Sequence, residues 1–454
     1  MDNLPSHSGY IHLKEKRHFS YDFVNGELII HAHSAMPEIE GNNMIYVQRY
    51  DNKCCLLYSQ VPVKIADCAI YPQNYKHKID WVIENFEIGS KFHRAIFSFD
   101  ELQYFCPSSQ VVRNTDNEVS FIMEPKELHS FDFYVDEKKC HAAFVVRSKG
   151  TYGLANSHMN AISEIIIDFE EMGDGLFLEK IYHVVDSAFA FICNRKNTTC
   201  ISMRLIGQYP SKGKKDGKIT DCIRDCSSNM IFYDRYREAP ENEKVISKTF
   251  YAAYMLKHMQ NLFQMIADDI SLDGEEAANI SISSIHPSLS RRRLIDLQQS
   301  LHITGAFEFY VRRYLPNMVC EKEYHTVIKM LLHEFAGKNT GKAKKLALSL
   351  ENNVVREPAL EEKVKKAFLG YDKWKPLKPC IDSAWFCENE IVELAKEANA
   401  WRNELAHEKR SYEPNVKTIR AIRLIEHLNY AIVLRKLGYV DSEIHDFLEN
   451  ILTR

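Results

Sequence analysis

Hydrophobic residues in the first half of the chain fall into short segments that favour β-strands. The segments are rich in β-branched and aromatic residues, and turn-forming pairs such as Asn25-Gly26 and Lys149-Gly150 separate them. The pattern predicts strands at 27–33, 44–49, 54–58, 61–65, 80–88, 92–99, 120–123, 131–135, 142–147, 165–169 and 199–208. A longer apolar segment at 177–193 has helical spacing. The polar segment 211–218 favours a solvated hairpin tip over a nucleic-acid contact.

From about Glu243 onward the hydrophobic period becomes that of amphipathic helices. The pattern predicts helices at 245–270, 287–314, 321–335, 343–352, 361–370, 388–405, 415–437 and 441–452. We therefore predict an α+β chain in two parts, with a β-rich half followed by an all-α bundle. The expected divisions are a β-rich domain at 1–243, a bridging helix with an acidic connector at 244–284, and a helical domain at 285–454.

Composition places the chain among ordinary globular proteins. It has 454 residues, 45% hydrophobic and 26% charged, and a formal net charge of −4. No apolar run approaches the ~18 residues that a membrane-spanning helix needs, and the first residues lack the pattern of a secretory signal. We expect a cytoplasmic protein without a membrane partner.

One stretch is locally basic although the whole chain is not. Residues 341–378 contain ten lysines and arginines against five acidic residues. Such a face suits a phosphate backbone, and the candidate RNA contacts are Lys342, Lys344, Lys345, Lys363 and Lys366. The alternative is a solvated helix surface whose lysines pair with acids four residues away.

A cluster of polar side chains ends the helix predicted at 388–405. Arg402, Asn403 and His407 follow the apolar Trp401. Asn403 and His407 share a helix face, whereas Arg402 and His407 lie about 140° apart on an ideal helix. Arg402 and His407 can converge if the helix loosens near Ala406 or if the long arginine side chain extends around the helix. They can also converge if a second protomer supplies one of them.

This set of side chains is sufficient for metal-independent RNA cleavage. A histidine can take the proton of a ribose 2′-hydroxyl or give one to the leaving 5′-oxygen. An arginine can stabilise the charge that develops on the phosphate, and Asn403 can orient a phosphate oxygen or the imidazole. The products would be a 2′,3′-cyclic phosphate and a 5′-hydroxyl. No metal or other cofactor is required, and the region has no carboxylate cluster for a two-metal mechanism.

Spacing alone does not decide this assignment. The chain has 19 histidines, so chance pairs of arginine and histidine are expected, and Arg420 with His427 is another. That pair lies within an apolar helical stripe, and we interpret it as structural. By spacing alone, Arg402 and His407 would also be structural more often than catalytic.

Other candidate chemistry is weaker. Twelve cysteines without a CxxC pair indicate reduced thiols, and Cys193, Cys200, Cys222 and Cys226 lack the spacing of common zinc sites. His31 and His33 share a strand face but have no identifiable third ligand. Neither Cys106 nor Cys226 has a feature of a nucleophile, and phosphate-binding or serine-hydrolase motifs are lacking.

Arg402-Asn403, with His407 four residues further on, resembles the R-(N/D/H)-x-x-x-H motif of HEPN ribonucleases. The β-rich half, with Phe97–Leu102 and the helix around 179–191, is similar to the N-terminal region of ApeA-like anti-phage abortive-infection proteins. The segment Leu297–Tyr310 is similar to the opening helix of their HEPN domain. The resemblance covers nearly the whole chain, and only the 402–407 motif in it is sharp.

The resemblance implies a HEPN-type bundle that forms a homodimer or a higher oligomer, with motifs from two protomers in one ribonuclease site. It assigns phosphate binding to Arg402, a helper role to Asn403 and proton transfer to His407. Glu308 is a weaker candidate that matches an acidic position of the opening helix, and the alternative is a surface carboxylate paired with Arg312 four residues later. The implied substrate is RNA, often tRNA, and the implied role is anti-phage defence.

We predict the first of the following two functions, and the second is its alternative. In the first, the N-terminal half restrains the ribonuclease until a phage-derived trigger binds to it. In the second, the helical domain is a non-catalytic module that binds RNA or protein, and Arg402 and His407 only connect helices.

Overall fold

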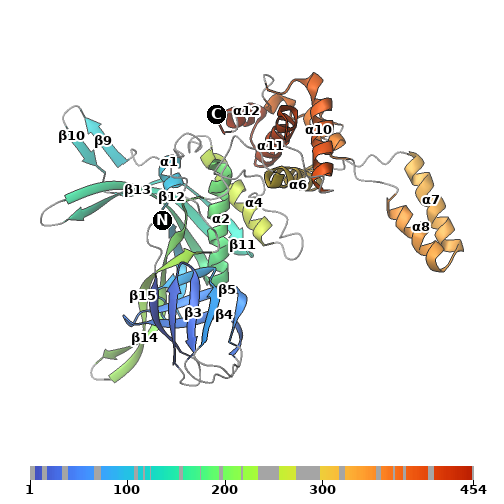
Figure 1. Ribbon diagram of the computed structural model, residues 1–454. Helices are drawn as coiled ribbons and strands as arrows, with labels where there is room; N and C mark the ends of the chain where they lie inside the picture. The colour runs from blue at the N-terminus through green and yellow to red at the C-terminus, as the bar shows by residue number, and fades with distance from the viewer. Residues whose placement is uncertain are drawn as a thin grey trace. The chain divides into compact units, whose positions relative to one another are not determined.

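A computed structural model of the chain divides into two compact units, shown in Figure 1. One unit comprises Met1–Cys193 with Asn197–Leu272, and the other comprises Asn194–Lys196 with Asp273–Arg454. The structure describes residues 6–12, 18–32, 39–65, 73–106, 111–115, 118–122, 124–152, 157–173, 175–193, 198–215, 218–233, 255–271, 297–315, 323–353, 359–371, 374–381, 385–406 and 414–451. A β-rich N-terminal half followed by a helical C-terminal half confirms the predicted two-part α+β chain.

The first unit is built on an antiparallel sheet in the order β11-β12-β13-β8-β14-β15-β7-β5-β4-β1-β2-β3-β6, and β9 and β10 form a separate pair. Its strands are β1 (His7–His12), β2 (His18–Val24), β3 (Glu27–Ala32), β4 (Ile39–Arg49), β5 (Cys54–Ile65), β6 (Gln73–Lys78), β7 (Trp81–Glu84), β8 (Lys91–Phe97), β9 (Val112–Thr115), β10 (Glu118–Phe121), β11 (Lys126–Val135), β12 (Lys138–Tyr152), β13 (Ser157–Gly173), β14 (Ser202–Lys215) and β15 (Lys218–Phe232).

Helices cover part of this sheet. The described helices of the unit are α1 (Asp100–Phe105), α2 (Gly175–Cys193), the short 3-10 helix η3 (Leu256–His258) and α4 (Met259–Ile270). α2 and α4 pack against each other and against β11. α4 belongs to the segment predicted as a bridge, yet its Phe263 is fully buried and its ring lies 5.1 Å from that of Phe131 and 5.4 Å from that of Phe133. The described part of the bridge is thus core of the first unit.

Turn residues set two hairpins of the sheet. Asn25 and Gly26 both have positive φ, 51° and 80°, in the two-residue turn between β2 and β3. Asp136 and Glu137 adopt the same left-handed region between β11 and β12, with φ of 48° and 64°. This is the turn whose twist matches that of antiparallel strands. The segment predicted as the polar hairpin tip is largely strand, because β14 and β15 remain paired up to Lys215 and Lys218.

The second unit is helical. Its elements are α6 (Leu297–Tyr314), α7 (Glu323–Lys338), α8 (Gly341–Asn353), α9 (Leu360–Leu369), the 3-10 helix η5 (Lys378–Cys380), α10 (Glu388–Ala406), α11 (Val416–Lys436) and α12 (Asp441–Ile451). α11 is the central helix, since it contacts α6, α10, α12 and α9, and each residue from Leu424 to Leu434 is buried. Over the described residues, no helix is long and apolar enough to cross a membrane.

A buried histidine in the first unit makes a testable contribution to acid sensitivity. His7 is 8% exposed, and its Nδ1 lies 2.9 Å from the hydroxyl of Tyr21. Burial, reinforced by the positive charge of Arg49 and opposed by Asp51, lowers the pKa of His7 to about 4. The unfolded chain therefore takes up this proton near pH 6.5, whereas the folded chain does so only near pH 4.

We expect His7 to cost about 3 kcal/mol of stability as the pH falls from 6.5 to 4. The loss should be absent above this range and complete below it. Urea unfolding at several pH values measures the effect, with His7→Gln as the non-titrating comparison that can still hydrogen-bond to Tyr21. Equal pH dependence of the two proteins would contradict the prediction.

Candidate functional site

The end of α10 presents two of the predicted site residues to solvent. Trp401 is 2% exposed and anchors this turn in the core of the second unit. The next residue, Arg402, has a side chain that is 39% exposed, and Asn403 is exposed. α10 ends at Ala406, and His407 lies outside the described residues. Arg402 and Asn403 are therefore accessible to a ligand, and the predicted convergence with His407 remains a prediction.

Glu308 on α6 holds the guanidinium of Arg402. Its Oε2 accepts a hydrogen bond of 3.0 Å from Nη2 of Arg402, and its Oε1 lies 3.6 Å from Nζ of Lys363 on α9. The Glu308 side chain is 19% exposed, so it is a half-buried carboxylate that bridges two other helices rather than a freely exposed surface group. One carboxylate thus connects α6, α9 and α10.

Among the described residues, the hydrogen bond to Glu308 uses only one nitrogen of the Arg402 guanidinium, which leaves other N–H donors for a ligand. A guanidinium has five N–H donors, and among the described residues only Nη2 of Arg402 makes a hydrogen bond. The ion pair fixes one edge of the planar group, while the remaining donors can meet a second oxyanion. A planar guanidinium of this kind can bind two oxygens of a phosphate.

Lys363 does not belong to the exposed basic face predicted from the sequence. It is 2% exposed and lies on the inward stripe of α9 with Leu360, Val364, Ala367 and Phe368. Positions 360, 363, 364, 367 and 368 have the spacing of one buried helix face. The correction has a simple cause: a count of lysines ignores which helix face each one occupies. Lys363 is instead a partner of Glu308.

The other predicted RNA contacts divide between two helices. Lys342, Lys344 and Lys345 are exposed on α8, and no carboxylate of the described residues forms an ion pair with them. Lys366 on α9 pairs with Glu362 at 3.0 Å, four residues earlier. The alternative of a solvated helix surface with i,i+4 pairs therefore applies to α9, whereas α8 retains unpaired positive charge.

The second arginine–histidine pair is structural, as predicted. His427 is 4% exposed, and its Nδ1 lies 2.7 Å from the carbonyl oxygen of Arg423 one turn earlier in α11. Arg420 donates to Glu390 at 2.9 Å and to the carbonyl oxygen of Trp385 at 2.8 Å. These contacts connect α11 to the start of α10, and the buried imidazole is not accessible to a substrate.

The weaker metal and nucleophile candidates receive no support from the described residues. Both ring nitrogens of His31 lie 2.8 Å from side chains, those of Asn74 and Asp22, and His33 lies outside the described residues. Cys222 on β15 lies opposite Ser211 on β14. Ser211 is roughly 30 Å along β14 from the start of that strand, which follows Cys200, so Cys222 and Cys200 are too far apart to share a metal ion. Burial raises the pKa of Cys106 to about 12, which suppresses its thiolate. No group of three or more metal-binding side chains occurs in the part of the chain that is described.

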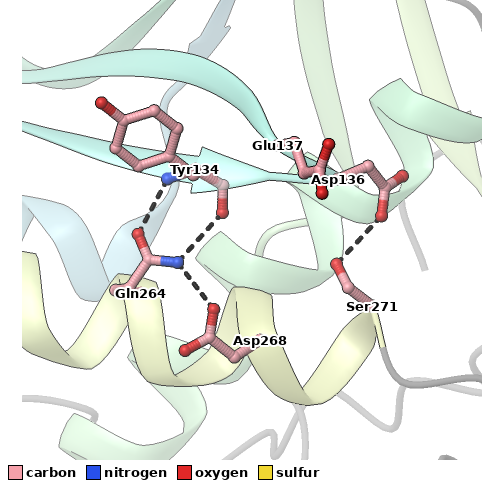
Figure 2. A pocket seen from close by; sticks show the side chains of 6 residues that line it. All are labelled: Tyr134, Asp136, Glu137, Gln264, Asp268 and Ser271. Atoms are coloured by element: carbon pink, nitrogen blue, oxygen red, sulfur yellow. Dashed lines mark hydrogen bonds between the residues drawn. The ribbon is translucent and has the colours of Figure 1, made fainter.

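A hollow in the first unit is lined by acidic side chains, in contrast to the basic residues near Arg402 and on α8 (Figure 2). It has a volume of about 730 Å³, and it is lined by Tyr134, Asp136, Glu137, Gln264, Asp268 and Ser271. Burial disfavours ionisation of Asp136, but hydrogen bonds from Lys180 and Ser271 outweigh this effect and keep the pKa of Asp136 below its ordinary value. Three carboxylates make this hollow a poor site for a phosphate.

Gln264 at this hollow protects the edge of the sheet. Its Oε1 accepts a 2.9 Å hydrogen bond from the N–H of Tyr134, and its Nε2 donates to the carbonyl oxygen of Tyr134 at 3.3 Å (Figure 2). β11 is an edge strand, and such edges attract further strands unless their backbone groups are satisfied. This contact joins residues 130 positions apart, and no local sequence signal could have predicted it.

Comparison with protein-family models, with curated proteins and with solved structures finds no match to this chain.

Proposed function

We propose that the helical unit is a metal-independent endoribonuclease of the HEPN type, with tRNA as the first substrate to test. The observation that carries the proposal is the state of Arg402, whose side chain is 39% exposed and whose guanidinium is held on one edge by Glu308, with no other hydrogen bond to it among the described residues. A preorganised arginine of this kind is what an enzyme needs where charge builds up on a phosphate.

The chemistry proposed for this site is internal transesterification. His407 removes the proton of a ribose 2′-hydroxyl, and the 2′-oxygen attacks the adjacent phosphorus. The bond from phosphorus to the 5′-oxygen breaks, and that oxygen takes a proton from an imidazolium. Arg402 stabilises the charge on the non-bridging oxygens, and Asn403 orients the phosphate. A second protomer is the proposed source of the second imidazole.

The remaining parts of the proposal concern affinity and control. The three exposed lysines of α8, Lys342, Lys344 and Lys345, would attract the RNA backbone, so binding should weaken as salt rises. The β-rich unit would restrain the cytoplasmic enzyme until a phage-derived trigger arrives, because an unrestrained ribonuclease would poison its host.

The same contact also supports a second candidate function. The ion pair between Arg402 and Glu308 connects α10 to α6, which is what a non-catalytic RNA- or protein-binding module would use it for. The two candidates differ in whether His407 is needed for cleavage or only for the fold.

Sequencing of RNA ends separates these candidates. In phage-infected cells that express the wild-type chain, we expect new 2′,3′-cyclic phosphate ends at defined sites, and we expect His407→Ala to abolish them. His445→Ala is the matched control, because His445 is a part-exposed histidine on α12 whose side chain is 34% exposed. Ends that persist in His407→Ala, or that the wild type never produces, would contradict the ribonuclease proposal.

A further inference from the structure

The hairpin of β14 and β15 extends beyond the strands on either side of it (Figure 1). β14 pairs with β8 as far as Gln208, and β15 pairs with β7 from Asn229 onward. Past these points the two strands pair only with each other among the described residues, over seven residue pairs that join 209–215 to 218–224. We call these two segments the ribbon. At about 3.3 Å per residue, the ribbon is roughly 20 Å long.

The ribbon adds no core to the fold. None of its described side chains is buried, and Ile223 is 72% exposed. A two-stranded hairpin without packing is at best marginally stable in water, and ordering its backbone costs conformational entropy. The extension therefore contributes little to the stability of the unit, and contact with another molecule is the simplest use for it.

The ribbon is basic, although the part of the chain that carries it is acidic. Residues 209–224 contain five lysines and arginines against two aspartates. The basic residues are Lys212, Lys214, Lys215, Lys218 and Arg224. Only Lys212 among them lies opposite an acidic residue in the ladder, Asp221. The rest of the segment 1–240 has 22 basic and 30 acidic residues, so the positive charge of the ribbon is local and favours a polyanion.

The shape of the ribbon distinguishes between polyanions. Its two strands lie about 4.8 Å apart, and the major groove of B-form DNA, about 12 Å wide and 8.5 Å deep, admits a two-stranded ribbon. A ribbon of roughly 20 Å exceeds the depth of this groove, so its end can enter while the sheet stays outside. The major groove of A-form RNA is too narrow for side chains to read.

We propose that the ribbon is an arm that binds double-stranded DNA by entering the major groove, with its basic side chains on the flanking phosphates. Phosphate contacts carry no sequence information, so the arm should bind DNA of any sequence. The sequence favoured a solvated hairpin tip for 211–218, and the paired extension past both neighbouring strands is what changes this interpretation. The inference does not rest on the proposed ribonuclease activity.

Neutralising the lysines of the ribbon tests the proposal. The variant combines Lys212→Gln, Lys214→Gln, Lys215→Gln and Lys218→Gln in the full chain. Fluorescence anisotropy with a short labelled DNA duplex, at several salt concentrations, measures the dissociation constant. We expect binding at physiological salt to weaken at least about 10-fold, and the slope of log K against log salt to fall by roughly 3–4, because each phosphate contact contributes about 0.9.

The matched control removes the same charge from the same unit outside the ribbon. It combines glutamine substitutions of four exposed lysines, Lys53, Lys76, Lys78 and Lys126. This variant should bind the duplex within about 2-fold of the wild type, because its lysines lie away from the proposed phosphate contacts. A duplex with bulky groups on C5 of its pyrimidines, which project into the major groove, should bind the wild type at least about 10-fold more weakly.

Four results would overturn the proposal. A wild type that does not bind the duplex, or a ribbon variant that binds as tightly as the control, would exclude the arm. Undiminished binding to the C5-modified duplex would exclude entry into the major groove. Tighter binding of duplex RNA than of DNA through the same lysines would make RNA the partner. Aggregation of the ribbon variant, with no DNA affinity in the wild type, would show that the lysines only protect open strand edges.

Discussion

Replacing Arg402 with alanine is expected to lower the rate of RNA cleavage by about 10²–10³-fold, with little change in stability. The rate should fall because the guanidinium is proposed to stabilise charge that develops only in the transition state, and loss of one such donor has an effect of this size. Stability should change by no more than about 1 kcal/mol, since the ion pair with Glu308 is partly exposed. Single-turnover cleavage and thermal unfolding of the same preparations measure both quantities.

Arg420→Ala is the matched control for this experiment. Arg420 is an arginine of the same unit with a 37% exposed side chain, an ion pair of 2.9 Å to Glu390 and a further hydrogen bond to the carbonyl oxygen of Trp385, so its substitution removes at least as many structural contacts as that of Arg402. Normal cleavage by Arg420→Ala together with a large loss in Arg402→Ala would locate the effect at the site. Equal losses in the two variants, or an Arg402→Ala protein that cleaves normally, would favour the non-catalytic module.

The sequence pattern predicted the helices of the second unit well, because their amphipathic spacing is a local signal, and in α11 a glycine stop signal adds to it. α11 was expected at 415–437 and spans Val416–Lys436, and Gly438 follows it with φ of 98°, a conformation that glycine adopts without strain. The described end of the first predicted helix also agrees, since α4 ends at Ile270. Such signals lie within a few residues of one another and need no knowledge of the tertiary fold.

The strands were harder to predict, because pairing partners can supply what the local pattern lacks. β6 has the sequence Gln-Asn-Tyr-Lys-His-Lys and is an edge strand, so it has few apolar positions to detect. β15 was not predicted, since its neighbour β14 stabilises a largely polar segment along its whole length. β1 and β2 were also missed, although they pair with each other and bury Ile11, Tyr21 and Phe23.

The candidate site was predictable only in part. Arg402 and Asn403 emerged from a local motif, whereas Glu308 was suggested by resemblance and its contact with Arg402 spans 94 positions. The role of Lys363 was missed, although the apolar spacing of α9 would have placed it on the inward face. Local spacing identifies which residues can do chemistry, but the partners that orient them depend on helix packing.

Phe263→Ala is expected to destabilise the first unit by about 3–5 kcal/mol, the cost of removing a buried phenylalanine. The ring is fully buried against Phe131, Phe133 and Phe144, with centroid distances of 5.1, 5.4 and 6.5 Å. Because α4 packs on β11, the loss should lower the melting temperature of the β-rich unit by roughly 6–20 °C. Differential scanning calorimetry of the full chain can assign the shift to one unit if the two units unfold in separate transitions.

Tyr134→Ala is the matched control, because Tyr134 follows Phe133 on β11 but points outward and is 49% exposed. Its hydrogen bonds with Gln264 come from the backbone and remain after truncation, so Tyr134→Ala should cost no more than about 1 kcal/mol. A small effect of Phe263→Ala, comparable to that of the control, would show that α4 does not pack on β11 and β12. A large effect would establish that the folded core of the β-rich unit extends through α4.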